Sequence, residues 1–147
     1  YVDGLPSMEE INGCHILIID DLMKDLANSS EIGDLFTRGR HLQISTIFIV
    51  QNALPQGRQM RNVNLNTHYL ILFNNPSDGS QIDLIAGRLY VRQKPFFLAA
   101  FADATKHAYG YIRRDNTQDT PNKYRLQTDI TPKDGKLITI CYIPKNV

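Results

Sequence analysis

Three short, almost wholly apolar segments stand out along the chain, at residues 15–19, 46–50 and 69–73. Polar residues follow each segment directly: Asp20-Asp21, Gln51-Asn52 and Asn74-Asn75. Continuous apolar runs of this length are typical of strands buried on both faces, because a strand with one wet face alternates apolar and polar residues. The pattern therefore predicts the parallel sheet of an α/β fold.

Helical signals lie between the first two segments. Ser29 or Ser30 can cap a helix that ends near Gly39, and its apolar face is formed by Ile32, Leu35 and Phe36. A strand, helix, strand order with a right-handed crossover is expected.

A second helix is predicted after the third segment. Asp78 and Gln81 have capping-box spacing, and the apolar positions at i, i+3, i+4 and i+7 are Ile82, Ile85, Ala86 and Leu89. From Pro95 onward the pattern breaks into β-like pieces at residues 96–101, 109–113 and 137–143. We expect the sheet to finish there with antiparallel or edge strands. Residues 1–147 are interpreted as one domain, with a parallel α/β part over about 1–91 and a β-rich part over about 92–147.

Composition is that of an ordinary folded domain, since 42% of the 147 residues are hydrophobic and 21% are charged. The net charge is +1, but it is unevenly distributed: three basic and eight acidic residues up to Asn52 give −5, and thirteen basic and seven acidic residues from Ala53 onward give +6. The basic second half is compatible with DNA phosphates or with an ordinary solvated surface.

No apolar run approaches the length of a membrane span, so no membrane partner is expected. Cys14 and Cys141 lie beside apolar runs and are predicted to be reduced core residues.

Asp20 and Asp21 end an apolar strand, which is the Walker B pattern of nucleotide hydrolases. There the first carboxylate holds Mg²⁺ and the second polarises the attacking water. Asp-Asp at a strand end is also common where the acids only cap the next helix, and the pattern alone leaves both interpretations open.

Gln51 ends the neighbouring predicted strand, and an amide can orient the water because it both donates and accepts hydrogen bonds. The alternative is a glutamine that caps a turn.

Four segments taken together resemble the genome-packaging ATPases of Polinton (Maverick) elements and adintoviruses. They are LFTRGRH at residues 35–41, VQN at 50–52, GRQMRNVNLN at 57–66 and LFNNPSDGSQI at 72–82. That family belongs to the FtsK-HerA superfamily and is related to the poxvirus packaging ATPase. The similarity covers about residues 4–131 and rests on the order of the motifs.

The resemblance implies a RecA-like P-loop fold of the additional-strand class, with three layers and a mainly parallel sheet. It also implies an ATP- and Mg²⁺-dependent ring of identical subunits, a hexamer, that pumps double-stranded DNA into a capsid and meets capsid or portal components. Asp20 would hold the metal and Asp21 and Gln51 would act on the water. Arg38, Arg40 and Arg61 match the neighbourhoods from which an arginine finger reaches the next subunit. The expected location is intracellular, in the nucleus or viral factory of a eukaryotic host or in the virion.

Two departures limit this resemblance. No Gly-x-x-x-x-Gly-Lys-Ser/Thr loop occurs in the sequence, so the fold is expected to be incomplete at the N-terminus and the chain alone to be a poor ATPase or none. The family also tends to carry basic residues where this chain has Asn74, Ser77 and Gly79. The alternative function is therefore a non-catalytic, domesticated or decayed remnant that serves as a binding or assembly module.

Aromatic and basic residues interleave at Tyr69, Tyr109 and Tyr111 with Arg113 and Arg114. Such interleaving is compatible with base stacking on single strands, but packing within a strand is the interpretation that the pattern favours. Between the last two tyrosines, Gly110 indicates a close backbone approach or a bulge. The four histidines are too scattered to predict a metal site.

Overall fold

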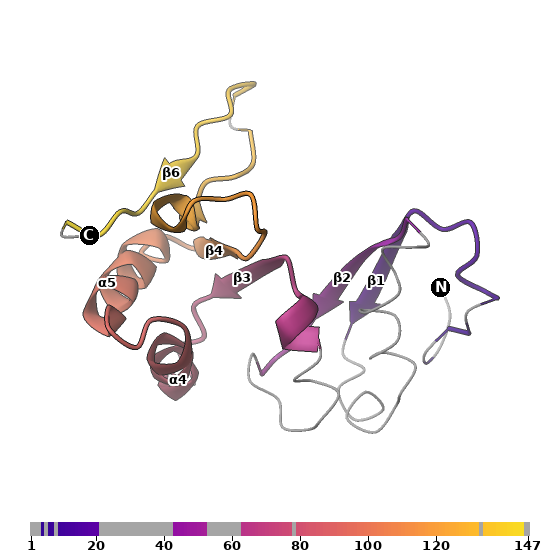
Figure 1. Cartoon of the computed structure of the whole chain (residues 1–147), viewed down its shortest axis with the longest axis horizontal. Helices are drawn as coiled ribbons and strands as arrows, with labels where there is room; N and C mark the ends of the chain where they lie inside the picture. Colours follow the sequence, from indigo (N-terminus) through magenta and orange to yellow (C-terminus); the bar gives the residue numbers. More distant parts are fainter. Residues whose placement is uncertain are drawn as a thin grey trace. The chain divides into compact units, whose positions relative to one another are not determined.

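The computed structural model describes residues 4, 6–7, 9–20, 43–52, 63–77, 79–132 and 134–145. The chain forms two compact units, residues 1–67 and 68–147, and the described strands of each unit form their own sheet (Figure 1). The helix predicted between residues 29 and 39, and with it the crossover, lies outside the described residues. The single domain over residues 1–147 stays a prediction.

The first unit contains a parallel pair of strands, β1 (Ile16–Asp20) and β2 (Ser45–Ile49). Ile16 pairs with Ser45 and Asp20 pairs with Ile49, so the two strands run in register over their full length. The hydrogen bond from Ser45 N to His15 O, 2.9 Å long, extends the ladder by one residue. Both strands and their parallel pairing are confirmed, each within one residue of the predicted bounds.

Burial of these two strands on both faces was a wrong prediction. Ile16 and Ile18 are 62% and 61% exposed, and Ile47 and Ile49 are each 49% exposed, whereas Ile19 on the opposite face is buried. Both faces of each strand are apolar in composition, but only one of them is covered. An apolar run indicates that burial of both faces would be favourable. It does not predict whether another element of the fold covers the second face.

The second unit contains an antiparallel sheet in the order β3-β4-β5-β6. Its strands are β3 (Tyr69–Phe73), β4 (Tyr111–Asp115), β5 (Leu126–Thr128) and β6 (Ile140–Cys141). The antiparallel strands expected near the C-terminus are therefore confirmed, although β6 is much shorter than the predicted 137–143 and β5 was not predicted. The bounds of β3 match the prediction, but its inclusion in the parallel sheet was wrong, because its described partner is β4 in antiparallel register.

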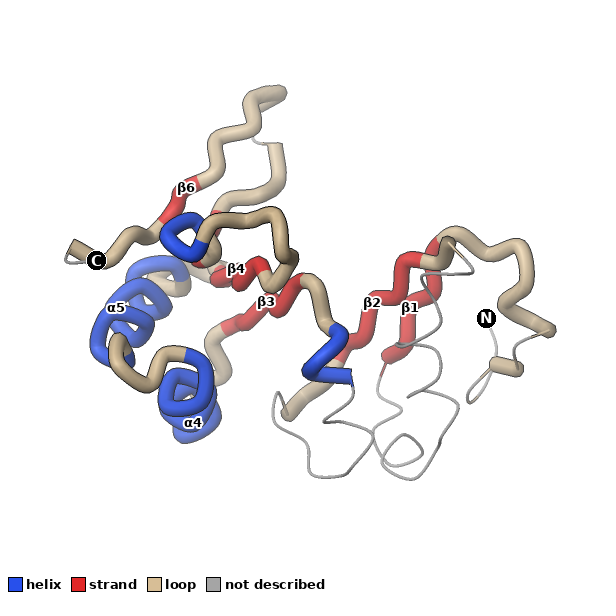
Figure 2. Tube along the Cα trace, viewed as in Figure 1, coloured by secondary structure: helices blue, strands red, loops and turns tan. Residues whose placement is uncertain are grey.

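Two helices cover one face of this sheet (Figure 2), α4 (Ser80–Leu89) and α5 (Lys94–Ala104). The first confirms the predicted helix, with Ile85 and Ala86 buried; its N-cap is Gly79, and no side chain caps it. The second overturns the β-like piece predicted at residues 96–101. Pro95 stands in the first turn, where its missing N–H costs nothing. Alanines favour the helix, and the buried residues Phe97, Ala100 and Phe101 recur at helical spacing. The apolar run therefore has a helical period, and the predicted strand was wrong.

The core of the second unit forms where these helices meet the sheet. Phe97, Ile85 and Ile112 are fully buried, and Leu72 and Leu126 complete the layer. The Phe97 ring stacks on Tyr90, with 4.9 Å between ring centroids. Burial raises the pKa of the Tyr90 phenol, although the positive charge of Arg114, 5.7 Å from the ring, acts in the opposite direction. Side chains of β3 and β4 that point away from this core form what we call the outer face: Tyr69, Ile71, Phe73, Tyr111, Arg113 and Asp115.

Cys14 and Cys141 are both free thiols, as predicted, but both are exposed, so their predicted place in the core was wrong. Cys14 precedes β1 in a turn, and Cys141 lies in the two-residue β6, whose residues are both exposed. Proximity to an apolar run did not place either side chain inside. In the described part of the chain, no helix has the length and apolar character needed to cross a bilayer.

Gly110 sits where the chain turns from α5 into β4, and the predicted close backbone approach is confirmed. A Cβ at this position would lie 2.5 Å from Ala104 O and 2.9 Å from His107 O, both of them backbone atoms. Gly110 N donates to His107 O in a tight turn, and Tyr109 within that turn has a φ of 62°. The turn therefore has no room for a side chain at Gly110.

We expect Gly110→Ala to lower the free energy of unfolding by about 1–3 kcal/mol, since backbone must move to admit the methyl group. The matched control is Gly87→Ala in α4, where a Cβ would meet nothing within 4 Å. There alanine should stabilise the helix by up to about 1 kcal/mol because of its higher helix propensity. Urea unfolding followed by circular dichroism measures both; equal effects of the two substitutions would contradict the crowding at Gly110.

Tyr142, directly after β6, is tied to α5 by a hydrogen bond of 2.8 Å from its hydroxyl to Asp103 Oδ2. Burial, together with this hydrogen bond and the negative charge of Asp103, raises the pKa of Tyr142 to about 12. The carboxylate in turn accepts hydrogen bonds from Lys106 and Tyr142, which lower the pKa of Asp103. The neutral phenol is thus favoured by the folded state and the ionised phenol by the unfolded state.

The stabilisation from Tyr142 should therefore be complete below pH 10 and be lost as the pH rises from 10 to about 12. Denaturant unfolding of the wild type and of Tyr142→Phe at pH 8 and pH 11 tests this expectation. The wild type should lose more stability than the variant between these two pH values. Identical losses in the two proteins would mean that the hydroxyl contributes nothing to the attachment of β6.

Candidate functional site

The parallel pairing of β1 and β2 sets the geometry of the site predicted from the sequence. Because the strands are parallel, their carboxyl ends lie at the same edge of the sheet, which is where ligands bind in α/β sheets. Asp20 is the last residue of β1 and pairs with Ile49, the last residue of β2. Gln51 follows two residues further on, roughly 7 Å along an extended chain. Asp20 and Gln51 therefore lie at one sheet edge.

Both side chains are accessible from solvent, since Asp20 and Gln51 are each exposed. Asp20 belongs to the exposed row of β1 that also contains Ile16 and Ile18, so its carboxylate stands at the end of an open apolar face. An accessible carboxylate can contribute one oxygen to a cation that keeps most of its water ligands, as Mg²⁺ does. An exposed amide beside it can accept from or donate to such a water.

The remaining predicted site residues, Asp21, Arg38, Arg40 and Arg61, lie outside the described residues. Among the residues that the structure does describe, no group of three or more His, Cys, Asp and Glu side chains is arranged to hold a metal ion. Asp20 and Gln51 are thus the two predicted residues whose placement can be reported.

The sequence departs from the packaging-ATPase motifs that it resembles at Asn74, Ser77 and Gly79. These residues lie in the exposed connection between β3 and α4. Asn75 Oδ1 accepts a hydrogen bond of 3.0 Å from Ser77 N, which shapes this turn, and Asn74 precedes it. Gly79 is the N-cap of α4. The residues in this connection therefore form a turn and a helix start.

A buried polar cluster around Asp115 is a second place where titratable groups gather. Asp115 accepts hydrogen bonds from Thr117 N at 2.9 Å, Thr117 Oγ1 at 2.7 Å and Thr120 Oγ1 at 3.0 Å. Burial alone would raise the pKa of Asp115, but these hydrogen bonds and the charge of Arg113 outweigh it and lower the pKa. Arg125 Nη1 also donates to the carbonyls of Asp115 and Thr117. With its carboxylate oxygens already bonded, Asp115 anchors the loop after β4.

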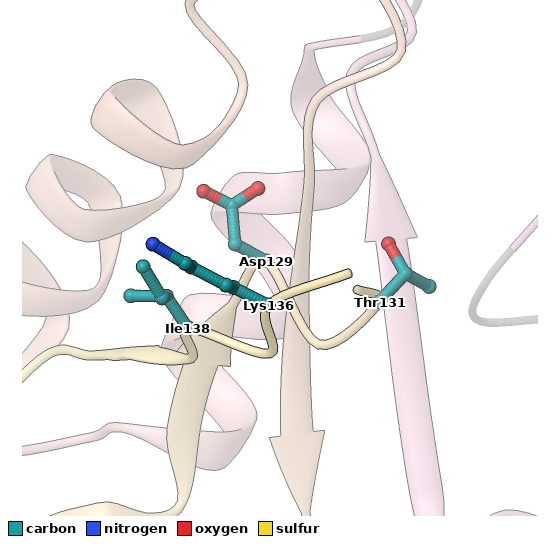
Figure 3. A pocket seen from close by; sticks show the side chains of 4 residues that line it. All are labelled: Asp129, Thr131, Lys136 and Ile138. Carbon is teal, nitrogen blue, oxygen red and sulfur yellow. The ribbon is translucent and has the colours of Figure 1, made fainter. Parts of the chain in front are cut away.

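A small hollow of about 200 Å³ lies in the connection between β5 and β6 (Figure 3). Its lining residues are Asp129, Thr131, Lys136 and Ile138. The chain turns sharply here, with positive φ at Asp129, Asp134 and Gly135. The hollow is smaller than the roughly 300–1,000 Å³ of most small-molecule sites. The Asp134-Gly135 dipeptide is a turn signal that predicts the bend but not the hollow.

The tyrosines that interleave with Arg113 and Arg114 in the sequence lie in different environments. Packing within a strand was predicted for Tyr69, Tyr109 and Tyr111. Tyr69 lies in β3 with Arg113 over its ring, although the residue is 52% exposed. The prediction was wrong for Tyr109, which lies in the turn before β4 and is 92% exposed. Tyr111 is half-buried beside Phe73, with 5.9 Å between ring centroids. Alternation along β3 is the signal that could have separated Tyr69, Ile71 and Phe73 from the buried Leu72.

Comparison of the chain with protein-family models, with curated proteins and with solved structures gave no match.

Proposed function

We propose that this chain is the Walker B segment of an ATP-driven translocase that packages double-stranded DNA of a viral or transposon genome into a capsid. The proposed fold is a P-loop ATPase of the additional-strand class. The observation that supports it best is the parallel pairing of β1 and β2, which brings Asp20 and Gln51 to the same sheet edge. The order of motifs that resembles packaging ATPases is the second support.

In this proposal Asp20 would hold Mg²⁺ through its exposed carboxylate, and Asp21 would polarise the attacking water. Gln51 orients that water by donating and accepting hydrogen bonds. When bound with ATP, Mg²⁺ neutralises charge that develops on the phosphates. In this proposal the two carboxylates and the amide of the site come from the end of β1 and from the residues directly after β1 and β2.

Two further components complete the proposed motor. Arg38, Arg40 or Arg61 supplies the guanidinium that reaches the γ-phosphate bound by a neighbouring subunit in a hexameric ring. The phosphate-binding loop is not among these 147 residues, so hydrolysis is proposed for a protein in which this segment is joined to such a loop.

The chain alone should show no Mg²⁺-dependent ATP turnover above background, because the backbone amides and lysine that hold the β- and γ-phosphates are missing. Phosphate release is measured for the wild type and for Asp21→Asn. The two rates should be the same and equal to that of buffer. A measurable rate that Asp21→Asn abolishes would show that the 147 residues contain a complete site.

In a longer protein that includes the phosphate-binding loop, Asp20→Ala and Asp21→Asn should each lower ATP turnover by about 10²–10⁴-fold. The matched control is Glu9→Gln, which removes an exposed acid in the turn that precedes β1 and should leave turnover unchanged. Turnover that survives Asp20→Ala and Asp21→Asn would assign both acids to helix capping. The chain would then be better explained as a non-catalytic binding or assembly module.

A further inference from the structure

On the outer face of the second unit's sheet the row of β3 is exposed, whereas Asp115 of β4 is buried. The opposite face of the sheet is covered by α4 and α5 (Figure 2). Leu72 and its register partner Ile112 point toward the helices and are buried. On the outer face, Tyr69, Ile71 and Phe73 are 52%, 45% and 59% exposed. Three large side chains in one row of a single strand form a continuous patch, and exposed apolar patches of this kind mark sites of interaction.

Aromatic rings and a guanidinium contact one another on this face. The Phe73 and Tyr111 rings form one pair, and Arg113 lies over the Tyr69 ring at 5.0 Å from its centroid. Arg113 is held in place by Gln127 Oε1, to which it donates, and by Asp115 Oδ2 at 3.6 Å. Tyr69 and Phe73 are four residues apart on β3, which is about 14 Å along an antiparallel strand. The two exposed rings are thus separate platforms on one fixed surface.

The net charge of the unit indicates which class of partner binds to these rings. Residues 68–147 carry eleven basic and seven acidic residues, a net charge of +4, while residues 1–67 carry five and eight, a net charge of −3. A net positive charge favours a polyanion over a neutral partner. Among polyanions, nucleic acid also presents flat π-faces. Rings on a rigid sheet can stack with bases only when the bases are unpaired, because a duplex keeps its bases inside.

We propose that the outer face binds single-stranded nucleic acid, with unpaired bases stacked on Tyr69 and on the Phe73–Tyr111 pair. The Arg113 guanidinium, fixed by Gln127 and Asp115, lies over the Tyr69 ring and holds it in place for stacking. Binding tolerates many sequences, since every base has a π-face. This site is distinct from the proposed Asp20–Gln51 site and needs neither ATP nor metal.

The test is fluorescence anisotropy of labelled 12-nucleotide dT and rU strands titrated with the whole chain, without nucleotide, at low salt. Binding with a Kd of about 1–100 µM that weakens with added salt is expected. Tyr69→Ala and Phe73→Ala should each weaken it by roughly 5- to 100-fold. Tyr69→Phe keeps the ring and should bind within about twofold of the wild type. Circular dichroism confirms that each variant is folded.

The matched control is Tyr109→Ala, which removes a tyrosine that is 92% exposed but lies in the turn before β4. It should leave the affinity unchanged. Equal losses in Tyr109→Ala and Tyr69→Ala, or no binding below about 100 µM, would overturn the proposal. So would a duplex of the same length that binds as tightly and responds equally to Tyr69→Ala. Sedimentation velocity covers one more outcome: self-association that Tyr69→Ala abolishes would assign the face to a second copy of the chain. The result is independent of ATP turnover, so it neither supports nor contradicts the proposed motor.

Discussion

Packing of α4 and α5 against one side of the antiparallel sheet is the interaction on which the second unit depends. Phe97, Ile85 and Ile112 are removed from water at this contact, and each buried side chain of this size contributes roughly 1.5–3 kcal/mol. Because successive residues of a strand alternate between faces, burying Leu72 against the helices sends its neighbours Ile71 and Phe73 to the other side. Packing of Leu72 into the core therefore leaves the outer row of β3 exposed, and the proposed nucleic-acid surface is a consequence of that packing.

A different constraint acts in the first unit. Parallel strands must end at a common edge, so the residues that follow them are brought together whatever their separation in sequence. Asp20 and Gln51 are 31 positions apart, and the register of β1 and β2 brings them to one edge. This constraint is the basis of the joint role that we propose for them.

Predictions made from the chain succeeded where a local signal has only one structural meaning. The strand at residues 69–73, the helix around Ile85 and Ala86, and the close approach at Gly110 are of this kind. Residues 94–104 show the opposite case. Phe97, Ala100 and Phe101 lie in a short apolar run whose composition allowed both a strand and a helix, and the strand was the wrong choice. The core position predicted for the cysteines failed because proximity to an apolar run does not determine which way a side chain points.

The sequence by itself determined where most of the strands lie, that polar residues follow β1 and β2, and that the second half of the chain carries the positive charge. The tertiary structure alone decided that β3 pairs with β4 in antiparallel register and that Tyr69, Ile71 and Phe73 stay uncovered. The physical reason is that apolar composition is a local property that favours removal from water. The identity and direction of a strand's partner, and the face that a helix covers, depend on contacts between segments far apart in the chain.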